Sequence, residues 1–123
     1  MNTIRYKNLN LEADQFLLDM GCGEGRHSIG GLIESPANVI GLDLCLEDVR
    51  TAKRRLNDFE IGNLCTSCNF GVANINEIPF EESSLDAVIC SEVLEHVDSP
   101  QKSIEELIRV LKPGGILALS VPR

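Results

Sequence analysis

The chain has 123 residues, of which 43% are hydrophobic, and a formal net charge of −8. This is the length of one domain with a core of its own, and the composition is too apolar for a disordered chain. No apolar run approaches the roughly 20 residues of a membrane span, and the first residues lack the apolar stretch of a signal peptide. We therefore expect a cytoplasmic protein. The acidic balance argues against a nucleic-acid partner bound through its phosphates.

The first half of the chain predicts two strands, each followed by a helix. Residues 16–20 form a short apolar run typical of a buried strand, and a helix should extend from about Arg26 to Glu34. Residues 38–43 predict the second strand. The best helix follows, with two acidic residues in its first turn. Its apolar stripe consists of Val49, Ala52, Leu56 and Phe59.

The second half predicts three more strands, over residues 69–74, 85–90 and 116–121. The middle one should be buried on both faces. The segment Asp98-Ser99-Pro100 offers capping side chains and a proline for the start of another helix, and residues 112–115 should end it. The stripe of this helix consists of Ile104, Leu107, Ile108 and Leu111.

Strands and helices thus alternate along the chain. This alternation predicts an α/β fold with a Rossmann-like, doubly wound parallel sheet in the strand order 3-2-1-4-5. A ligand crevice is expected at the carboxyl ends of the strands, between the first and the fourth.

Two local clusters favour structural interpretations. The four Lys and Arg residues between positions 50 and 55 follow Glu47 and Asp48, which is typical of a solvated, salt-bridged helix face. The cysteines are odd in number, which favours reduced thiols: Cys22, Cys45, Cys65, Cys68 and Cys90. The pair Cys65-x-x-Cys68 has the spacing of half a zinc site or of a redox pair. Since both histidines are far away in sequence, we predict no metal site.

The segment Asp19-Met20-Gly21-Cys22-Gly23-Glu24-Gly25 lies where the first strand meets the first helix. Glycines there let a ligand approach the backbone, although a tight turn without a ligand is the alternative interpretation. The spacing is Gly-x-Gly-x-Gly, and Arg26 occupies the position where a dinucleotide fingerprint has its last glycine. The carboxylate of Asp19 opposes a pyrophosphate and favours a ligand with an ammonium or sulfonium group.

Asp43 ends the second strand, 18 residues after Gly25. This is close to the spacing of about 20 residues at which a carboxylate meets ribose hydroxyls. One carboxylate can accept hydrogen bonds from both the 2′ and the 3′ hydroxyl. The alternative is that Asp43 only caps the next helix.

At this point the sequence resembles the class I S-adenosylmethionine-dependent methyltransferases, and most closely their type 11 subset. The resemblance covers about residues 15–122. Five segments carry it in the family's order: Leu17–Gly25, Gly41–Leu44, Ala73–Phe80, Ser84–Val97 and Val110–Gly115.

The resemblance implies S-adenosylmethionine as methyl donor, with S-adenosylhomocysteine as product. The donor's methionyl and ribose parts would lie on the glycine loop, its amine near Asp19 and the Cys90 carbonyl, and its adenine on Leu44. Asn74 stands where the family usually has Asp, and its amide oxygen can still accept from the adenine amine. The cofactor contacts implied are Asp19, Gly21, Cys22, Gly23, Gly25, Asp43, Leu44, Asn74, Ile75 and Cys90.

The function implied is methyl transfer to a small-molecule acceptor. The catalytic residue is unknown. Glu92, Glu95 and His96 are candidates for a base or a metal-binding patch, and the alternative is that they face solvent or cap a helix. We expect His27 to be a packing or cofactor-edge residue.

The chain predicts five strands, whereas the family usually has seven, the last two forming an antiparallel hairpin. We therefore expect a single domain, residues 1–123, with an extension of about 15 residues at its start and a C-terminal truncation. The alternative function is a catalytically incomplete donor-binding fragment or subunit that needs a partner. A second copy or a partner would cover the exposed edge of the fifth strand. A nicotinamide-dependent oxidoreductase is disfavoured by the glycine spacing and by Asp19.

Overall fold

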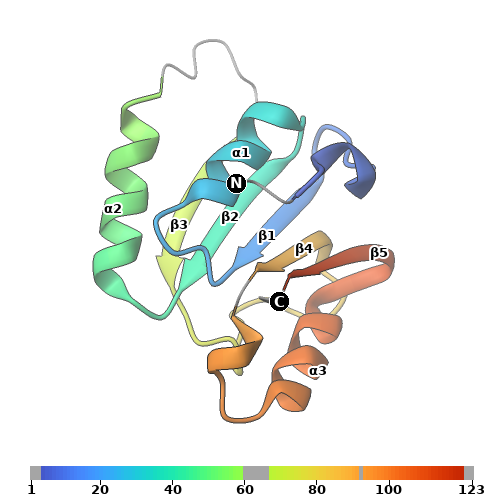
Figure 1. Ribbon diagram of the computed structural model, residues 1–123. Coiled ribbons are helices and arrows are strands. Elements are labelled where there is room, and N and C mark those ends of the chain that lie inside the picture. Colours follow the sequence, from blue (N-terminus) through green and yellow to red (C-terminus); the bar gives the residue numbers. More distant parts are fainter. Residues whose placement is uncertain (1–3, 60–66, 92, 121–123) are drawn as a thin grey trace.

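The computed structural model describes residues 4–59, 67–91 and 93–120, and its centre is a five-stranded parallel sheet (Figure 1). The strand order β3-β2-β1-β4-β5 confirms the predicted α/β Rossmann-like sheet. The strands are β1 (Phe16–Met20), β2 (Asn38–Asp43), β3 (Cys68–Val72), β4 (Leu85–Ser91) and β5 (Leu111–Ser120). The helices are α1 (Arg26–Glu34), α2 (Leu46–Asn57) and α3 (Pro100–Val110), with 3-10 turns η1 (Tyr6–Leu9) and η2 (Leu94–His96).

Helices cover both faces of the sheet. Since successive strand residues point to opposite sides, neighbouring residues of one strand pack in different core clusters. Leu18 of β1 belongs to the same core cluster as Leu107 of α3, whereas Leu17 packs in a cluster with Leu32 of α1. Burial on both faces explains why β1 and β4 have nearly continuous apolar sequences. None of the described helices is long and apolar enough to cross a membrane.

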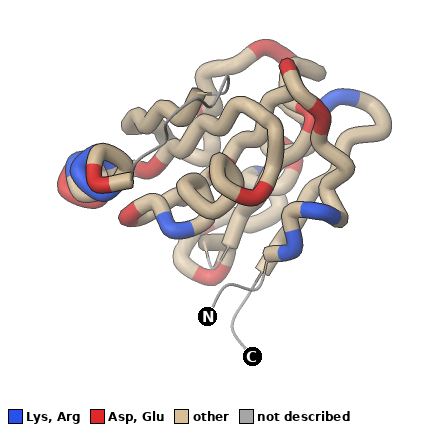
Figure 2. The backbone as a smooth tube through the Cα atoms, turned by 90° about the horizontal axis from the view of Figure 1, so that it is seen from above, with Lys and Arg blue, Asp and Glu red and all other residues tan. Residues whose placement is uncertain are grey.

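Helix α2 is amphipathic, as predicted. Val49 and Ala52 are buried and Leu56 is partly buried, but the helix ends at Asn57 and leaves Phe59 44% exposed. The prediction that Phe59 continues the stripe is therefore wrong. On the outer face, Arg50 forms an exposed ion pair with Glu47 at 3.2 Å. Figure 2 shows α2 end-on, with basic and acidic residues side by side, so this helix has the predicted solvated, charged face.

Helix α3 differs from the prediction at both ends. Pro100 occupies its first turn, but Ser99 at the N-cap makes no side-chain capping hydrogen bond. The buried positions are Ser103, Leu107 and Val110, and Ile108 is 57% exposed. Of the predicted stripe, Leu107 is buried and Ile104 and Leu111 pack against the core cluster, whereas the prediction is wrong for Ile108; Leu111 packs there as the first residue of β5.

Strand β5 begins at Leu111, five residues earlier than predicted. Leu111 pairs with Leu85 and Ile116 with Ala87, so residues 112–115 bulge out of the ladder between these pairs. Gly114 permits the bulge with a φ of 83°. The segment predicted to be a helix stop therefore also bends the edge strand. Strand β3 likewise covers residues 68–72 instead of 69–74, and Asn74 forms an isolated bridge with Glu77.

Candidate functional site

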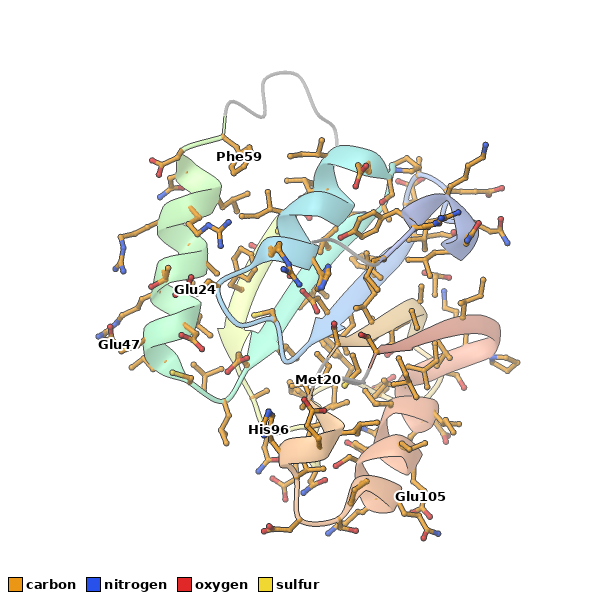
Figure 3. The ribbon with its side chains drawn as sticks, viewed as in Figure 1. Met20, Glu24, Glu47, Phe59, His96 and Glu105 are labelled. Atoms are coloured by element: carbon orange, nitrogen blue, oxygen red, sulfur yellow. The ribbon has the colours of Figure 1, made fainter. Side chains whose placement is uncertain are left out.

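A cavity of about 570 Å³ lies at the carboxyl ends of four strands. Residues from the ends of β1, β2, β3 and β4 line it, together with residues 93–98 around η2. Figure 3 shows Met20 at the end of β1 and His96 on η2, and both residues line the cavity. The cavity therefore lies at the sheet edge where the crevice was predicted.

The glycine turn after β1 is fastened to β2. The N–H groups of Gly21 and Cys22 both donate to the Leu42 carbonyl, at 2.7 and 2.9 Å. A Cβ atom on Gly21 would overlap the Val93 side chain, while one on Gly23 would meet no atom within 4 Å. Gly21 is thus required by close packing, and the open space beside Gly23 gives a ligand access to the backbone.

The carboxylate of Asp43 joins the two loops that follow β1 and β2. Its Oδ2 accepts a hydrogen bond from the Gly23 N–H, and its Oδ1 accepts one from the Cys45 N–H, both at 2.8 Å. The N-cap position of α2 is Cys45, so Asp43 stabilises the loops instead of capping the helix. A carboxylate has about four acceptor sites, so capacity for further hydrogen bonds remains on the cavity side.

Asp19 lies behind the glycine turn. It is 1% exposed, and its Oδ2 accepts a hydrogen bond from the Ser28 hydroxyl of α1 at 2.7 Å. Burial, and after it the nearby charge of Asp43, raise the pKa of Asp19 to about 6, although the hydrogen bond from Ser28 acts in the opposite direction. Asp19 is not among the residues that line the cavity at the strand ends, so any effect on a ligand there passes through the glycine turn.

The far wall of the cavity comes from the loops after β2 and β3. Leu44 is 69% exposed and offers an apolar surface, whereas Ile75 is buried. The Asn74 Oδ1 accepts a hydrogen bond from the Asn76 N–H at 2.9 Å. The structure thus brings Leu44, Asn74 and Ile75 together on one cavity. The Cys90 side chain is buried in the core on the α3 side, and its neighbour Ser91 lines the cavity.

A second cavity of about 420 Å³ lies on the other side of the glycine turn. It shares Gly21 and Ser91 with the first cavity, and Cys22 and Gly23 line it as well. His27 is buried at its edge, with its Nε2 at 3.2 Å from Nη2 of Arg26. This position agrees with the expectation that His27 is a packing or edge residue.

Of the three catalytic candidates, His96 lines the first cavity. Its side chain is 79% exposed, and its Nε2 lies 3.4 Å from Oε1 of Glu95. Glu95 does not line this cavity, and Glu92 lies outside the described residues. Within the described part of the chain, no group of three or more His, Cys, Asp or Glu side chains could hold a metal ion.

The cysteines differ in their surroundings. Cys22 and Cys90 are buried, Cys68 is half-buried and Cys45 is exposed; all four are free thiols. Burial raises the pKa values of Cys68 and Cys90 to about 12. The Cys65 half of the C-x-x-C pair lies outside the described residues.

The sequence did not single out several residues that line the first cavity: Met20, Ala73, Asn76, Ser91, Val93, Val97 and Asp98. Their positions in the sequence could have indicated that they line the cavity. Each lies at or shortly after the carboxyl end of a strand, and a doubly wound sheet brings these ends together.

Comparison with known proteins gives the family. A methyltransferase-domain family matches residues 18–119. The chain is 37% identical to a ubiquinone biosynthesis O-methyltransferase of Xanthomonas axonopodis pv. citri, over 98% of this chain and 49% of the relative. It is 33% identical to a demethylmenaquinone methyltransferase of Oceanobacillus iheyensis, over 89% of this chain and 45% of the relative. The chain thus spans about half the length of these relatives.

The fold agrees with this result. A solved SAM-dependent methyltransferase from Methanosarcina mazei superimposes with a TM-score of 0.83 and 29% identity. The match covers 97% of this chain and 57% of the solved chain. Sequence and structure therefore agree that this chain belongs to the class I S-adenosylmethionine-dependent methyltransferases of type 11.

Proposed function

We propose that this chain binds S-adenosylmethionine in the 570 Å³ cavity and transfers its methyl group to a small-molecule acceptor. The observation that carries the proposal is the Asp43 carboxylate, held at the cavity wall by the backbone N–H groups of Gly23 and Cys45. A side chain fixed in this way binds ribose hydroxyls without first losing conformational freedom.

The residues around Asp43 fit the other parts of the donor. The open space at Gly23 belongs to the adjoining 420 Å³ cavity, which meets the first at Gly21 and Ser91, and would receive the methionyl and ribose parts. The exposed Leu44 side chain would pack on the adenine. Asn74 has a second acceptor site on Oδ1 for the adenine amine, and the Ile75 N–H would face the ring nitrogen. The cavity volume lies within the range of about 300–1,000 Å³ that is usual for small-ligand sites.

The charges of the site suit a cationic ligand. Asp43 and Asp98 line the cavity, and Asp19 lies behind the glycine turn. The amine of the donor would lie near the Cys90 carbonyl, with Asp19 behind the glycine turn. A positive charge there would favour the ionised form of Asp19, whose pKa burial raises to about 6.

The sulfonium group of S-adenosylmethionine supplies an activated methyl carbon, so the protein mainly orients the reactants and excludes water. An acceptor hydroxyl would have to lose its proton. His96 lines the cavity, and the Glu95 Oε1 atom at 3.4 Å from its Nε2 would hold the ring proton on Nε2, which leaves Nδ1 as the proton acceptor. Val93 and Val97 lie beside it and would contact an apolar acceptor. The quinone-related names of two relatives are consistent with such an acceptor.

Calorimetric titration with S-adenosylmethionine, S-adenosylhomocysteine and NAD tests donor binding. We expect micromolar affinity for the first two and no heat with NAD. Binding of NAD with no response to the two adenosyl ligands would refute the proposal. Transfer of a labelled methyl group to candidate hydroxylated ring compounds then separates a methyltransferase from a chain that only binds the donor.

A further inference from the structure

The adenine side of the cavity is formed by a loop that is not part of the sheet. Residues 73–84 connect β3 to β4, and positions 73–76 line the cavity. The loop forms one isolated bridge, between Asn74 and Glu77, with the Glu77 N–H donating to the Asn74 carbonyl at 2.9 Å. The Ala73 N–H donates to the Asp43 carbonyl at 3.1 Å, and the Ile75 and Ile78 side chains pack in the same core cluster as Leu42, so the sheet anchors the loop through its start and its apolar side chains. The polar groups of Asn76 and Ile78 need partners elsewhere.

Helix α3 provides these partners through three side chains spaced three residues apart on one face. The Ser103 hydroxyl donates to Oδ1 of Asn76 at 2.9 Å. The Ile78 N–H donates to Oε2 of Glu106 at 2.7 Å, and Arg109 donates to the Ile78 carbonyl at 3.0 Å. Arg109 also donates to the Phe80 carbonyl at 2.9 Å. We call Ser103, Glu106 and Arg109 the α3 clamp.

The two charged members of the α3 clamp orient each other. The Arg109 Nε and Nη2 donate to the two carboxylate oxygens of Glu106, at 2.6 and 2.8 Å. This bidentate pairing fixes the orientation of the guanidinium plane relative to the carboxylate plane. The hydrogen bond from Arg109 lowers the pKa of Glu106. The N–H and the C=O of Ile78 thus meet a preformed acceptor and donor, as they would in a neighbouring strand.

A chain of hydrogen bonds leads from the clamp to the base-binding position. Ser103 holds the side chain of Asn76, and the backbone N–H of Asn76 donates to Oδ1 of Asn74. Because Oδ1 accepts from that N–H, the orientation of the Asn74 amide depends on where Asn76 lies. Ser103 is fully buried, so its hydroxyl has no water to replace this partner.

We propose that the α3 clamp is a positioning device for the donor site: it holds residues 74–78 so that Asn74 and Ile75 select an adenine base. The proposal rests on the proposed function, since it needs the donor's base at this wall. It assigns a role in donor selectivity to residues that do not line the cavity.

The test compares S-adenosylhomocysteine with S-inosylhomocysteine, in which an oxo group replaces the adenine amine. We expect the wild type to prefer the adenine ligand, and Ser103→Ala and Glu106→Gln each to reduce that preference by about threefold to tenfold. The matched controls are Ser99→Ala, whose hydroxyl makes no capping bond, and Glu105→Gln. Glu105 points outward from α3 (Figure 3), and both controls should keep the full preference.

Melting temperatures of the ligand-free variants separate positioning from stability. Alanine favours a helix more than serine, so Ser103→Ala should melt within a few degrees of the wild type. If a clamp variant weakens both ligands equally, or if both clamp variants keep the full preference, the proposed role of the clamp is overturned. The proposed donor-binding function is not. A wild type that binds neither ligand would overturn the proposed function and the clamp together.

Discussion

Replacing Asp43 with Asn removes the charge at the cavity wall and nearly preserves the shape of the side chain. The carboxylate accepts from two backbone N–H groups, at Gly23 and at Cys45. An amide has one oxygen, so its NH2 group must face one of these two donors. The variant therefore loses an acceptor on the loop side as well as the charge on the ligand side.

The size of the effect follows from these contacts. A hydrogen bond to a charged group contributes about 1.5–3 kcal/mol, and about 1.4 kcal/mol corresponds to a tenfold change in affinity. We expect Asp43→Asn to bind S-adenosylhomocysteine about 10–100-fold more weakly. The partly exposed loop contacts should cost about 1 kcal/mol of folding stability, because water replaces part of the lost bonding.

Titration calorimetry measures the affinity, and thermal melting without ligand measures the stability. Asp58→Asn is the matched control, since Asp58 is exposed at the opposite end of α2 and should leave the affinity unchanged. Wild-type affinity in Asp43→Asn would refute the ribose contact. A large loss of stability with no separate loss of affinity would show that Asp43 serves only the loops.

Three further predictions follow from the surroundings of the site. The pKa of Asp19 is raised from 3.8 to about 6, so the folded state binds the proton more tightly than the unfolded state. The contribution of Asp19 to the free energy of unfolding should therefore decrease by about 3 kcal/mol as pH rises from about 4 to above 6, and Asp19→Asn should remove this contribution from the pH dependence measured in denaturant titrations while weakening donor binding. Gly21→Ala should lower the free energy of unfolding by about 1–3 kcal/mol, because the φ of Gly21 is 81° and the new Cβ would overlap the Val93 side chain. Adding Val93→Ala should restore part of the lost melting temperature. Iodoacetamide at pH 8 should modify the exposed Cys45 at least about tenfold faster than the buried Cys90, as measured by peptide mapping.

Each of these predictions has a result that contradicts it. A pH dependence of stability in Asp19→Asn equal to that of the wild type would contradict the titration of Asp19. Unchanged melting of Gly21→Ala would mean that the turn can shift away from Val93, and additive effects in the double variant would show that the two side chains do not meet. Equal alkylation of Cys45 and Cys90 would contradict the burial of β4.

Much of the fold could be predicted because its signals are local. Alternation of apolar strands and amphipathic helices fixes a parallel sheet, and right-handed crossovers leave few strand orders. The errors in the predicted element boundaries lie where tertiary contacts determine the ends of helices and strands. Leu111 has the helical spacing of a core residue, but it pairs with Leu85 and starts β5. Phe59 continues the stripe of α2 in sequence, yet the helix ends two residues before it.

The candidate site likewise has a part that local sequence signals predict and a part that depends on tertiary contacts. Asp43 and the glycine turn were predictable because Asp43 is the last residue of β2 and the turn directly follows β1. The link between Ser103 and Asn76 was not, since 27 residues separate them and the contact depends on how α3 packs. The burial of Asp19 was missed as well, because its partner Ser28 lies on a helix whose rotation the sequence does not give.

The central claim is that the cavity at the strand ends holds the methyl donor through Asp43. A crystal structure of the chain with S-adenosylhomocysteine tests it most directly. We expect both ribose hydroxyls within hydrogen-bonding distance of the Asp43 carboxylate and the adenine between Leu44 and Ile75. An empty cavity at saturating ligand, or a nucleoside bound elsewhere, would contradict the account.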